Sequence, residues 1–167
     1  MKKLIIFLSL ILLSVSLQGQ LIKRANSFHK ARITTGGGNP EQISNGVFAD
    51  ATDWSVVTPG WTISGGTANY NDLNDYVSLW QIGEDMITDL IANTTYILEF
   101  DVSVGTINME IGNGNLTDQW FDYANYTVGH KSLEFTTPVG MTVGGIRFKA
   151  VTDASAGSLD NVSIKLQ

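Results

Sequence analysis

Three carboxylates in the middle of the chain are the residues whose spacing most clearly suggests chemistry. Glu99 and Asp101 precede the pair Gly105-Thr106, and Glu110 follows it. Glycine first in a two-residue loop is typical of a type II′ hairpin turn, and pairing outward from that turn sets Asp101 opposite Glu110, with Glu99 on the same face. The opposite, buried face would carry the apolar residues of both strands, namely Tyr96, Leu98, Phe100, Val102, Val104, Ile107, Met109 and Ile111. Like charges opposite each other destabilise a sheet. The acidic face is therefore either screened by solvent or neutralised by Arg147 or Lys149, by ligand hydroxyls or by a cation.

Aromatic side chains near polar residues provide a second set of candidates. Trp80 lies in opposite phase to Leu79 and should point to the polar face of its strand. Trp120, Tyr123 and Tyr126 gather in a segment rich in Asn, Asp and Gly. A pyranose has an apolar face and a hydroxyl rim, so rings beside hydrogen-bonding groups are typical of sugar sites. The segment fits a binding rim and a piece of core equally well.

Catalysis finds little support in the residues present. The chain has no Cys, and its two histidines are His29 and His130. The run Gly36-Gly37-Gly38 does not precede a helix, as a phosphate-binding loop would. Glycosidases use two carboxylates that flank the scissile bond, and only the three carboxylates named above suggest that role. The sequence predicts a protein that is not an enzyme and needs no catalytic cofactor.

Nearly everything after Ile43 has the residue pattern of β-structure. The clearest local signal is Gly65-Gly66, a two-residue turn whose flanking strands would pair Trp61 with Tyr70 and Ile63 with Ala68. Further strands are predicted at 76–82, 96–104, 107–111, 131–137, 142–151 and 158–166. Such a series of short strands separated by turn residues predicts a single all-β domain, an antiparallel β-sandwich.

The start of the chain has a different organisation. Lys2 and Lys3 precede an apolar run at 4–13 and a zone of small residues, which is the layout of a bacterial-type secretory signal peptide. The run is shorter than the roughly 20 residues that span a bilayer. We expect residues 1–19 to be this signal peptide, 20–42 to be a basic flexible arm or linker, and 43–167 to be the domain. The protein would then be secreted or held at the cell surface.

Charge and cysteine content limit the partners. The chain has 10 basic and 16 acidic residues, and two of the basic ones lie in the predicted signal peptide. An acidic surface disfavours nucleic acid and anionic membranes as partners. The basic arm at 20–42 is either a disordered leader or an attachment to a protein partner or a second copy. Without Cys, stability must come from apolar burial, with or without a bound metal.

Three motifs resemble one known family. They are Asn45-Gly46-Val47-Phe48, followed by Trp54 and Trp61; the stretch 92–102; and Ser158-Leu159-Asp160-Asn161-Val162. Together they resemble the jelly-roll carbohydrate-binding modules of families four and nine, within the galactose-binding-like superfamily. The resemblance implies an antiparallel jelly-roll β-sandwich in which both tryptophans belong to the core. Such domains also serve as adhesion modules and phage virion parts, so the motifs specify the fold better than the ligand.

The resemblance also implies a structural calcium ion. Asp160 matches the Asp-Asn-Val motif of the family. The family often has an acidic residue directly after Asn-Gly-x-Phe, but here that position is Ala49 and Asp50 follows it. Asp160 and Asp50 are therefore the implied calcium ligands, and an ordinary turn or cap role is the alternative for Asp160.

Two functions from different classes follow from these observations. The first is non-catalytic binding of a neutral glycan on a sheet face or on rim loops, through Trp80, Glu99, Asp101, Glu110, Trp120, Tyr123, Tyr126 and Arg147. The second is a structural or adhesive role, as in a surface or virion decoration protein whose arm mediates assembly.

Overall fold

The computed structural model describes residues 39–56, 60–71, 78–114, 118–151 and 156–167, apart from the side chains of Asp122 and Tyr123. The predicted signal peptide and nearly all of the predicted arm lie outside these residues. In the described part, Glu41 forms a β-bridge with Lys165, and the Gln42 amide donates to the Ile164 carbonyl at 2.8 Å. Residues 41 and 42 therefore already contact the last strand.

The described part is almost entirely antiparallel strand, as predicted. The strands are β1 (Ser55–Val56), β2 (Trp61–Ser64), β3 (Thr67–Tyr70), β4 (Ser78–Ile82), β5 (Thr95–Asn113), β6 (Gln119–Thr136), β7 (Gly144–Ala150) and β8 (Gly157–Leu166), with one 3-10 turn, η1 (Gly83–Asp85). Their order is β1-β4-β7-β5-β8-β3-β2, with β6 on the free edge of β5. No described helix is long and apolar enough to cross a membrane. The fold is a jelly-roll β-sandwich.

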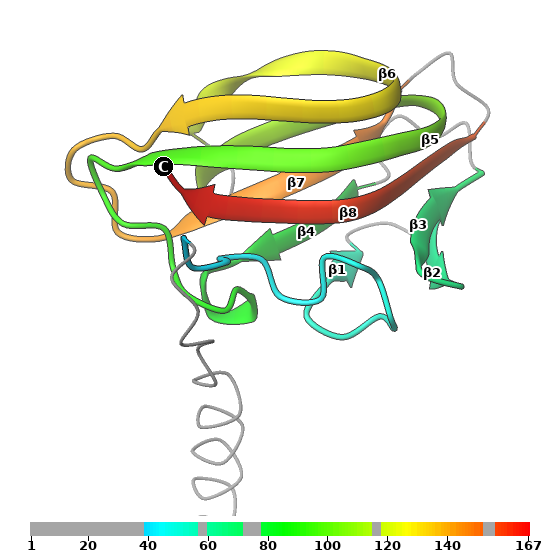
Figure 1. Ribbon diagram of the computed structural model, residues 1–167, viewed down its shortest axis with the longest axis horizontal. Helices are drawn as coiled ribbons and strands as arrows, with labels where there is room; N and C mark the ends of the chain where they lie inside the picture. Colours follow the sequence, from blue (N-terminus) through cyan, green and yellow to red (C-terminus); the bar gives the residue numbers. More distant parts are fainter. Residues whose placement is uncertain (1–38, 57–59, 72–77, 115–117, 152–155) are drawn as a thin grey trace, which may run out of the picture. The chain divides into compact units, whose positions relative to one another are not determined.

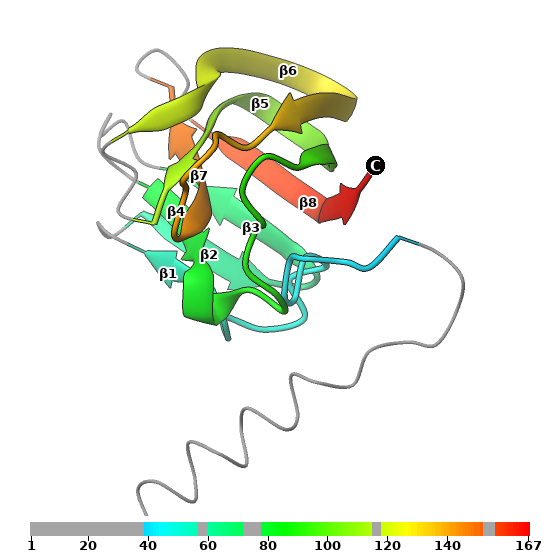
Figure 2. The same cartoon turned by 90° about the vertical axis from the view of Figure 1, so that its left-hand side faces the viewer.

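Two long strands belong to both layers of this sandwich. The first part of β5 pairs with β8, from Tyr96 to Gly105, and the second part pairs with β7, from Ile107 to Asn113. β6 follows β5 along both parts. Figure 1 shows β6 running along the molecule, bending and returning with β5 beside it, and Figures 1 and 2 both place β1 and β2 on the opposite side. One layer is therefore β2-β3-β8-β5-β6, and the other is β1-β4-β7-β5-β6.

The hairpin predicted around Gly65-Gly66 is confirmed. Trp61 pairs with Tyr70 and Ile63 with Ala68. Both glycines have positive φ, 64° and 83°, which is what a type I′ turn requires at its two central residues.

The hairpin predicted around Gly105-Thr106 is wrong. Gly105 has φ 69°, but it lies in an irregular stretch of a continuous β5, and the two halves of the strand do not pair with each other. Asp101 pairs with His130 and Asp160, and Glu110 pairs with Arg147. The two halves join different layers, so both still turn their apolar residues toward the core.

The core confirms most of the predicted apolar face. Phe100, Ile107 and Met109 are fully buried, whereas Val104, also predicted to be buried, is 50% exposed. Val104 lies in the irregular stretch before Gly105, where the strand leaves one layer for the other. Trp54 and Trp61 are buried in the core, as the resemblance implied. The segment after Gln119, read as a loop with aromatic rings, is strand β6.

Phe100→Ala should lower the free energy of unfolding by about 3–5 kcal/mol, because it removes a ring that meets Tyr126 and Phe148 edge-on and leaves a cavity. Val104→Ala, in the same strand, should change it by no more than about 0.5 kcal/mol. Urea unfolding of both variants measures the difference. A large loss for Val104→Ala would contradict its place at the irregular bend.

Candidate functional site

The outer face of the β1-β4-β7-β5-β6 layer carries a row of large polar side chains. Trp80 of β4 pairs with Arg147 of β7, and Arg147 pairs with Glu110 of β5. Residues that pair directly lie on the same side of a sheet, so the three side chains stand side by side. The sequence-predicted residues Trp80, Glu110 and Arg147 are thus brought together, although they come from strands far apart in the chain. We call this surface the polar face.

A buried carboxylate organises the polar face. The Glu110 side chain has no exposed surface, and those of Arg147 and Lys149 are 20% and 18% exposed. Arg147 donates from Nε to Glu110, Lys149 Nζ lies 3.1 Å from Oε2, and Gln119 Nε2 donates to Oε2 at 2.7 Å. Burial lowers the pKa of Arg147, and burial together with the nearby Arg147 charge lowers the pKa of Lys149. Glu110 therefore fixes two partly desolvated cations in place.

A second row lies beside the first. Ser78 pairs with Lys149, Lys149 with Asn108, and Asn108 with Asn125. Asn108 is 3% exposed and donates from Nδ2 to Asn125 Oδ1 at 2.7 Å. Its own Oδ1 has no hydrogen-bond partner among the described residues, and the same is true of the buried indole Nε1 of Trp80. Buried polar atoms are nearly always paired, so this face carries one acceptor and one donor whose hydrogen-bonding capacity is unused.

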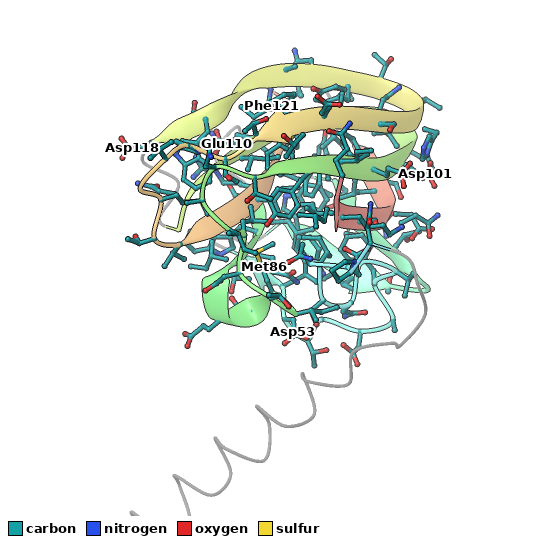
Figure 3. The ribbon with its side chains drawn as sticks, turned by 60° about the vertical axis from the view of Figure 1, so that its left-hand side comes forward. Asp53, Met86, Asp101, Glu110, Asp118 and Phe121 are labelled. Carbon is teal, nitrogen blue, oxygen red and sulfur yellow. The ribbon has the colours of Figure 1, made fainter. Side chains whose placement is uncertain are left out.

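The other two predicted carboxylates lie elsewhere. Glu99 and Asp101 are in the first half of β5, and Figure 3 shows Asp101 on the side of the molecule away from Glu110. Asp101 lies 2.8 Å from His130 Nδ1 and accepts a hydrogen bond of 2.8 Å from Asn161. The bond from Asn161, and then that from His130, hold the pKa of Asp101 below its ordinary value. The expected opposition of Asp101 and Glu110 does not exist.

The predicted aromatic segment turns mainly toward the core. Trp120 and Tyr126 of β6 are partly buried and pack against the hydrophobic core. Tyr126 pairs with Ile107, and its ring meets Phe100 edge-on with centroids 5.3 Å apart. Burial raises the pKa of Tyr126. The Tyr123 side chain lies outside the described residues.

The two implied calcium ligands have local partners. Asp50 accepts hydrogen bonds from the Thr52 amide at 2.8 Å and from Asn45 Nδ2 at 3.2 Å, and the Thr52 contacts lower its pKa. Asp160 accepts the Asn161 amide at 2.7 Å. Within the described residues, no three side chains of His, Cys, Asp or Glu gather closely enough to hold a metal.

Three more residues belong to the polar face: sequence reasoning missed Asn108 and Gln119, and it named Lys149 only as a possible neutralising charge. Asn108 is two positions before Glu110, and Lys149 is two positions after Arg147, so the two-residue period of a strand places each beside a predicted residue. Gln119 was missed because its segment was read as a loop. The periodicity thus contained the signal for two of the three.

Several solved structures with the same fold are carbohydrate-binding modules. A CBM4 module is 20% identical over 75% of this chain and 99% of its own, with a TM-score of 0.55. A xylan-binding domain from CBM22 is 12% identical over 78% of this chain and 96% of its own, with a TM-score of 0.54. No protein-family model matches the sequence, and no curated protein matches it. The chain therefore has the fold of a carbohydrate-binding module.

A third similar structure belongs to a different kind of protein. The enzymatically active domain of tailspike protein 4 from bacteriophage CBA120 is 18% identical over 76% of this chain, with a TM-score of 0.52. Only 21% of that chain is covered. The similarity covers one part of a longer protein, and it shows a shared fold alone.

Glu110→Gln should lower the free energy of unfolding by about 3 kcal/mol, because it leaves Arg147 and Lys149 partly buried without their carboxylate. Glu134→Gln is the matched control, since Glu134 is exposed, and should change stability by no more than about 0.5 kcal/mol. Thermal and urea unfolding measure both. Equal effects would show that the polar face does not depend on the Glu110 charge.

Calcium at Asp160 stays a prediction. If an ion is bound, a chelator should lower the melting temperature, added calcium should restore it, and Asp160→Ala should abolish the response. Asp50→Ala tests the second implied ligand in the same way. If the chelator does not change the melting temperature, Asp160 is a turn residue that accepts a hydrogen bond from the Asn161 amide.

Proposed function

We propose that this chain is a secreted, non-catalytic glycan-binding module, similar to modules of families four and nine, that holds a neutral glycan on the polar face. The observation that carries the proposal is the row of Trp80, Arg147 and Glu110 on one face. Two buried polar atoms of this face, Trp80 Nε1 and Asn108 Oδ1, have no partner in the part of the chain that the structure describes. A sugar hydroxyl both donates and accepts hydrogen bonds, so it can satisfy an indole N–H and an amide oxygen alike. The shared fold of carbohydrate-binding modules supports the same ligand class.

The polar face has the parts that sugar recognition requires. Trp80 is partly exposed and offers a ring for the apolar side of a pyranose. Arg147 is anchored through Nε, and its terminal nitrogens have no partner among the described residues. A guanidinium anchored by a carboxylate is pre-organised for hydroxyl oxygens, because little side-chain freedom remains to be lost on binding.

The charge of the chain favours a neutral ligand. The net charge of −6 repels acidic polysaccharides at long range. On the polar face, Glu110 offsets part of the charge of Arg147 and Lys149. Secretion is supported by the charged, apolar and small-residue zones of residues 1–19.

Glu110 is an unsuitable catalytic acid. A glycosidase needs one carboxylic acid that holds a proton and a second carboxylate across the glycosidic bond. The Glu110 side chain has no exposed surface, and its two oxygens are bonded to Arg147, Lys149 and Gln119, so neither is placed to protonate a glycosidic oxygen. Glu99 and Asp101 lie on the other half of β5. This arrangement favours binding over hydrolysis.

A structural or adhesive role is the second candidate. It is favoured by the similarity to part of a phage tailspike protein. A glycan array with the whole secreted chain separates the two functions. Specific binding to a neutral glycan supports the module, and failure to bind any glycan supports the structural role.

Trp80→Phe tests the indole donor, because it keeps a ring and removes Nε1–H. We expect affinity for a neutral polysaccharide to fall about tenfold, the value of one hydrogen bond, with little change in melting temperature. Trp80→Ala should lose more, since the stacking surface disappears as well. Affinity electrophoresis in soluble xylan and β-glucan gels, with polygalacturonate as the acidic comparison, measures the change.

Ser132→Ala is the control, since Ser132 is exposed on the half of β6 that belongs to the other layer. It should bind as the unchanged protein does. Unchanged binding by Trp80→Ala would place the ligand elsewhere, and stronger binding to polygalacturonate would overturn the neutral ligand.

A further inference from the structure

One end of the sandwich contains two hollows outside the polar face. The first, of about 290 Å³, is lined by Asp118, Trp120 and the 138–142 loop. The second, of about 370 Å³, is lined by Gly114 and Val143. Asn113 and Thr142 line both hollows, so the two are neighbours. We call this end of the sandwich the rim.

The rim opens on the opposite side of its strand from the polar face. Asn113 follows Ile111 and Met109 in the two-residue period of β5, and those two residues point into the core. Glu110 points the other way, onto the polar face. Figure 3 shows Asp118 at the end of the molecule, beyond Glu110. A ligand in the rim would therefore contact a different set of side chains from one on the polar face.

The walls of the rim differ in chemistry. Trp120 and Met141 are partly buried and form an apolar wall packed on the core. Asp118 and Thr142 are exposed and polar. The Asp118 carboxylate accepts from Asn113 Nδ2 at 3.0 Å, and its amide donates to Asn113 Oδ1 at 3.3 Å, so the acidic side chain is held in position.

We propose that the rim is a second glycan site, which takes a single sugar unit against Trp120 with its hydroxyls toward Asp118 and Thr142. An apolar ring opposite fixed polar groups matches the two sides of a pyranose. The hollow is at the lower end of the roughly 300–1,000 Å³ found for small-molecule sites, which fits one sugar unit better than a chain. The inference rests on the glycan ligand of the proposed function and adds a second place for it.

The four tryptophans allow the two sites to be observed separately. Each indole N–H gives one resonance in a proton–nitrogen NMR spectrum, and Trp→Phe variants assign it. Trp80 reports on the polar face and Trp120 on the rim. Trp54 and Trp61 are buried in the core and show whether a variant remains folded.

The probes are xylose, glucose and galactose, followed by xylohexaose and cellohexaose. We expect a monosaccharide to shift the Trp120 resonance, in the unchanged protein and equally in Trp80→Phe. Thr142→Tyr places a large side chain where both hollows meet and should remove the Trp120 response while the Trp80 response to the hexaoses persists. Ser132→Tyr, an exposed position in the other layer, should leave both responses intact.

The outcomes distinguish this inference from the proposed function. A Trp80 response without any Trp120 response overturns the rim site and leaves the polar face standing. A Trp120 response without a Trp80 response supports the rim and overturns the polar face. If Trp120 moves only together with Trp80 and stops moving in Trp80→Phe, the rim is not a separate site. If neither resonance moves with any probe, both assignments fail.

Discussion

The bend of β5 at Gly105 is the constraint on which the rest of the structure depends. A Cβ at Gly105 would lie 2.0 Å from the Ala156 carbonyl oxygen. The backbone φ of Gly105 is 69°, a value that residues other than glycine rarely adopt. The Tyr70 hydroxyl donates to the Thr106 carbonyl at 2.8 Å, and the Tyr70 ring fills the space beside Gly157, where a Cβ would lie 2.2 Å from it. The bend lets one strand serve two layers and sends the carboxylates on its two halves to different surfaces.

The first and last of the three motifs that resemble carbohydrate-binding modules contact each other in the structure. Gly46 lies so close to Val162 that a Cβ would be 1.8 Å from its carbonyl oxygen, and the Val162 amide donates to the Gly46 carbonyl at 2.9 Å. Trp54 donates its indole N–H to the Asn45 carbonyl at 3.1 Å. Asn161, with φ 53°, takes the left-handed position in the last motif. The first and last motifs therefore hold the two ends of the domain together, which explains why they specify a fold and not a ligand.

The sequence was informative where structure is local and less so where partners are distant. Gly65-Gly66 joins strands that pair with each other, so register could be read outward from the turn. Around Gly105 the same reasoning correctly predicted most of the buried apolar residues, but periodicity does not say whether two such segments pair with each other or lie in different layers. The buried state of Glu110 could not be predicted, because its partners Arg147 and Gln119 lie on strands whose neighbours only the fold decides.

The placement of charge links the fold to the proposed binding role. After Gln42 the chain has only four basic residues, and two of them, Arg147 and Lys149, stand beside Glu110. Two partly buried cations on one carboxylate cost desolvation free energy that a purely structural face could avoid with apolar residues of similar size. That cost is easier to understand if the side chains meet hydroxyl groups, since fixed donors lose little entropy when a ligand arrives. The same argument makes Glu110 a positioning residue, because its carboxylate is bonded to Arg147 and Lys149. The groups that would contact a sugar are then the Arg147 terminus, the Trp80 indole and the Asn108 amide oxygen.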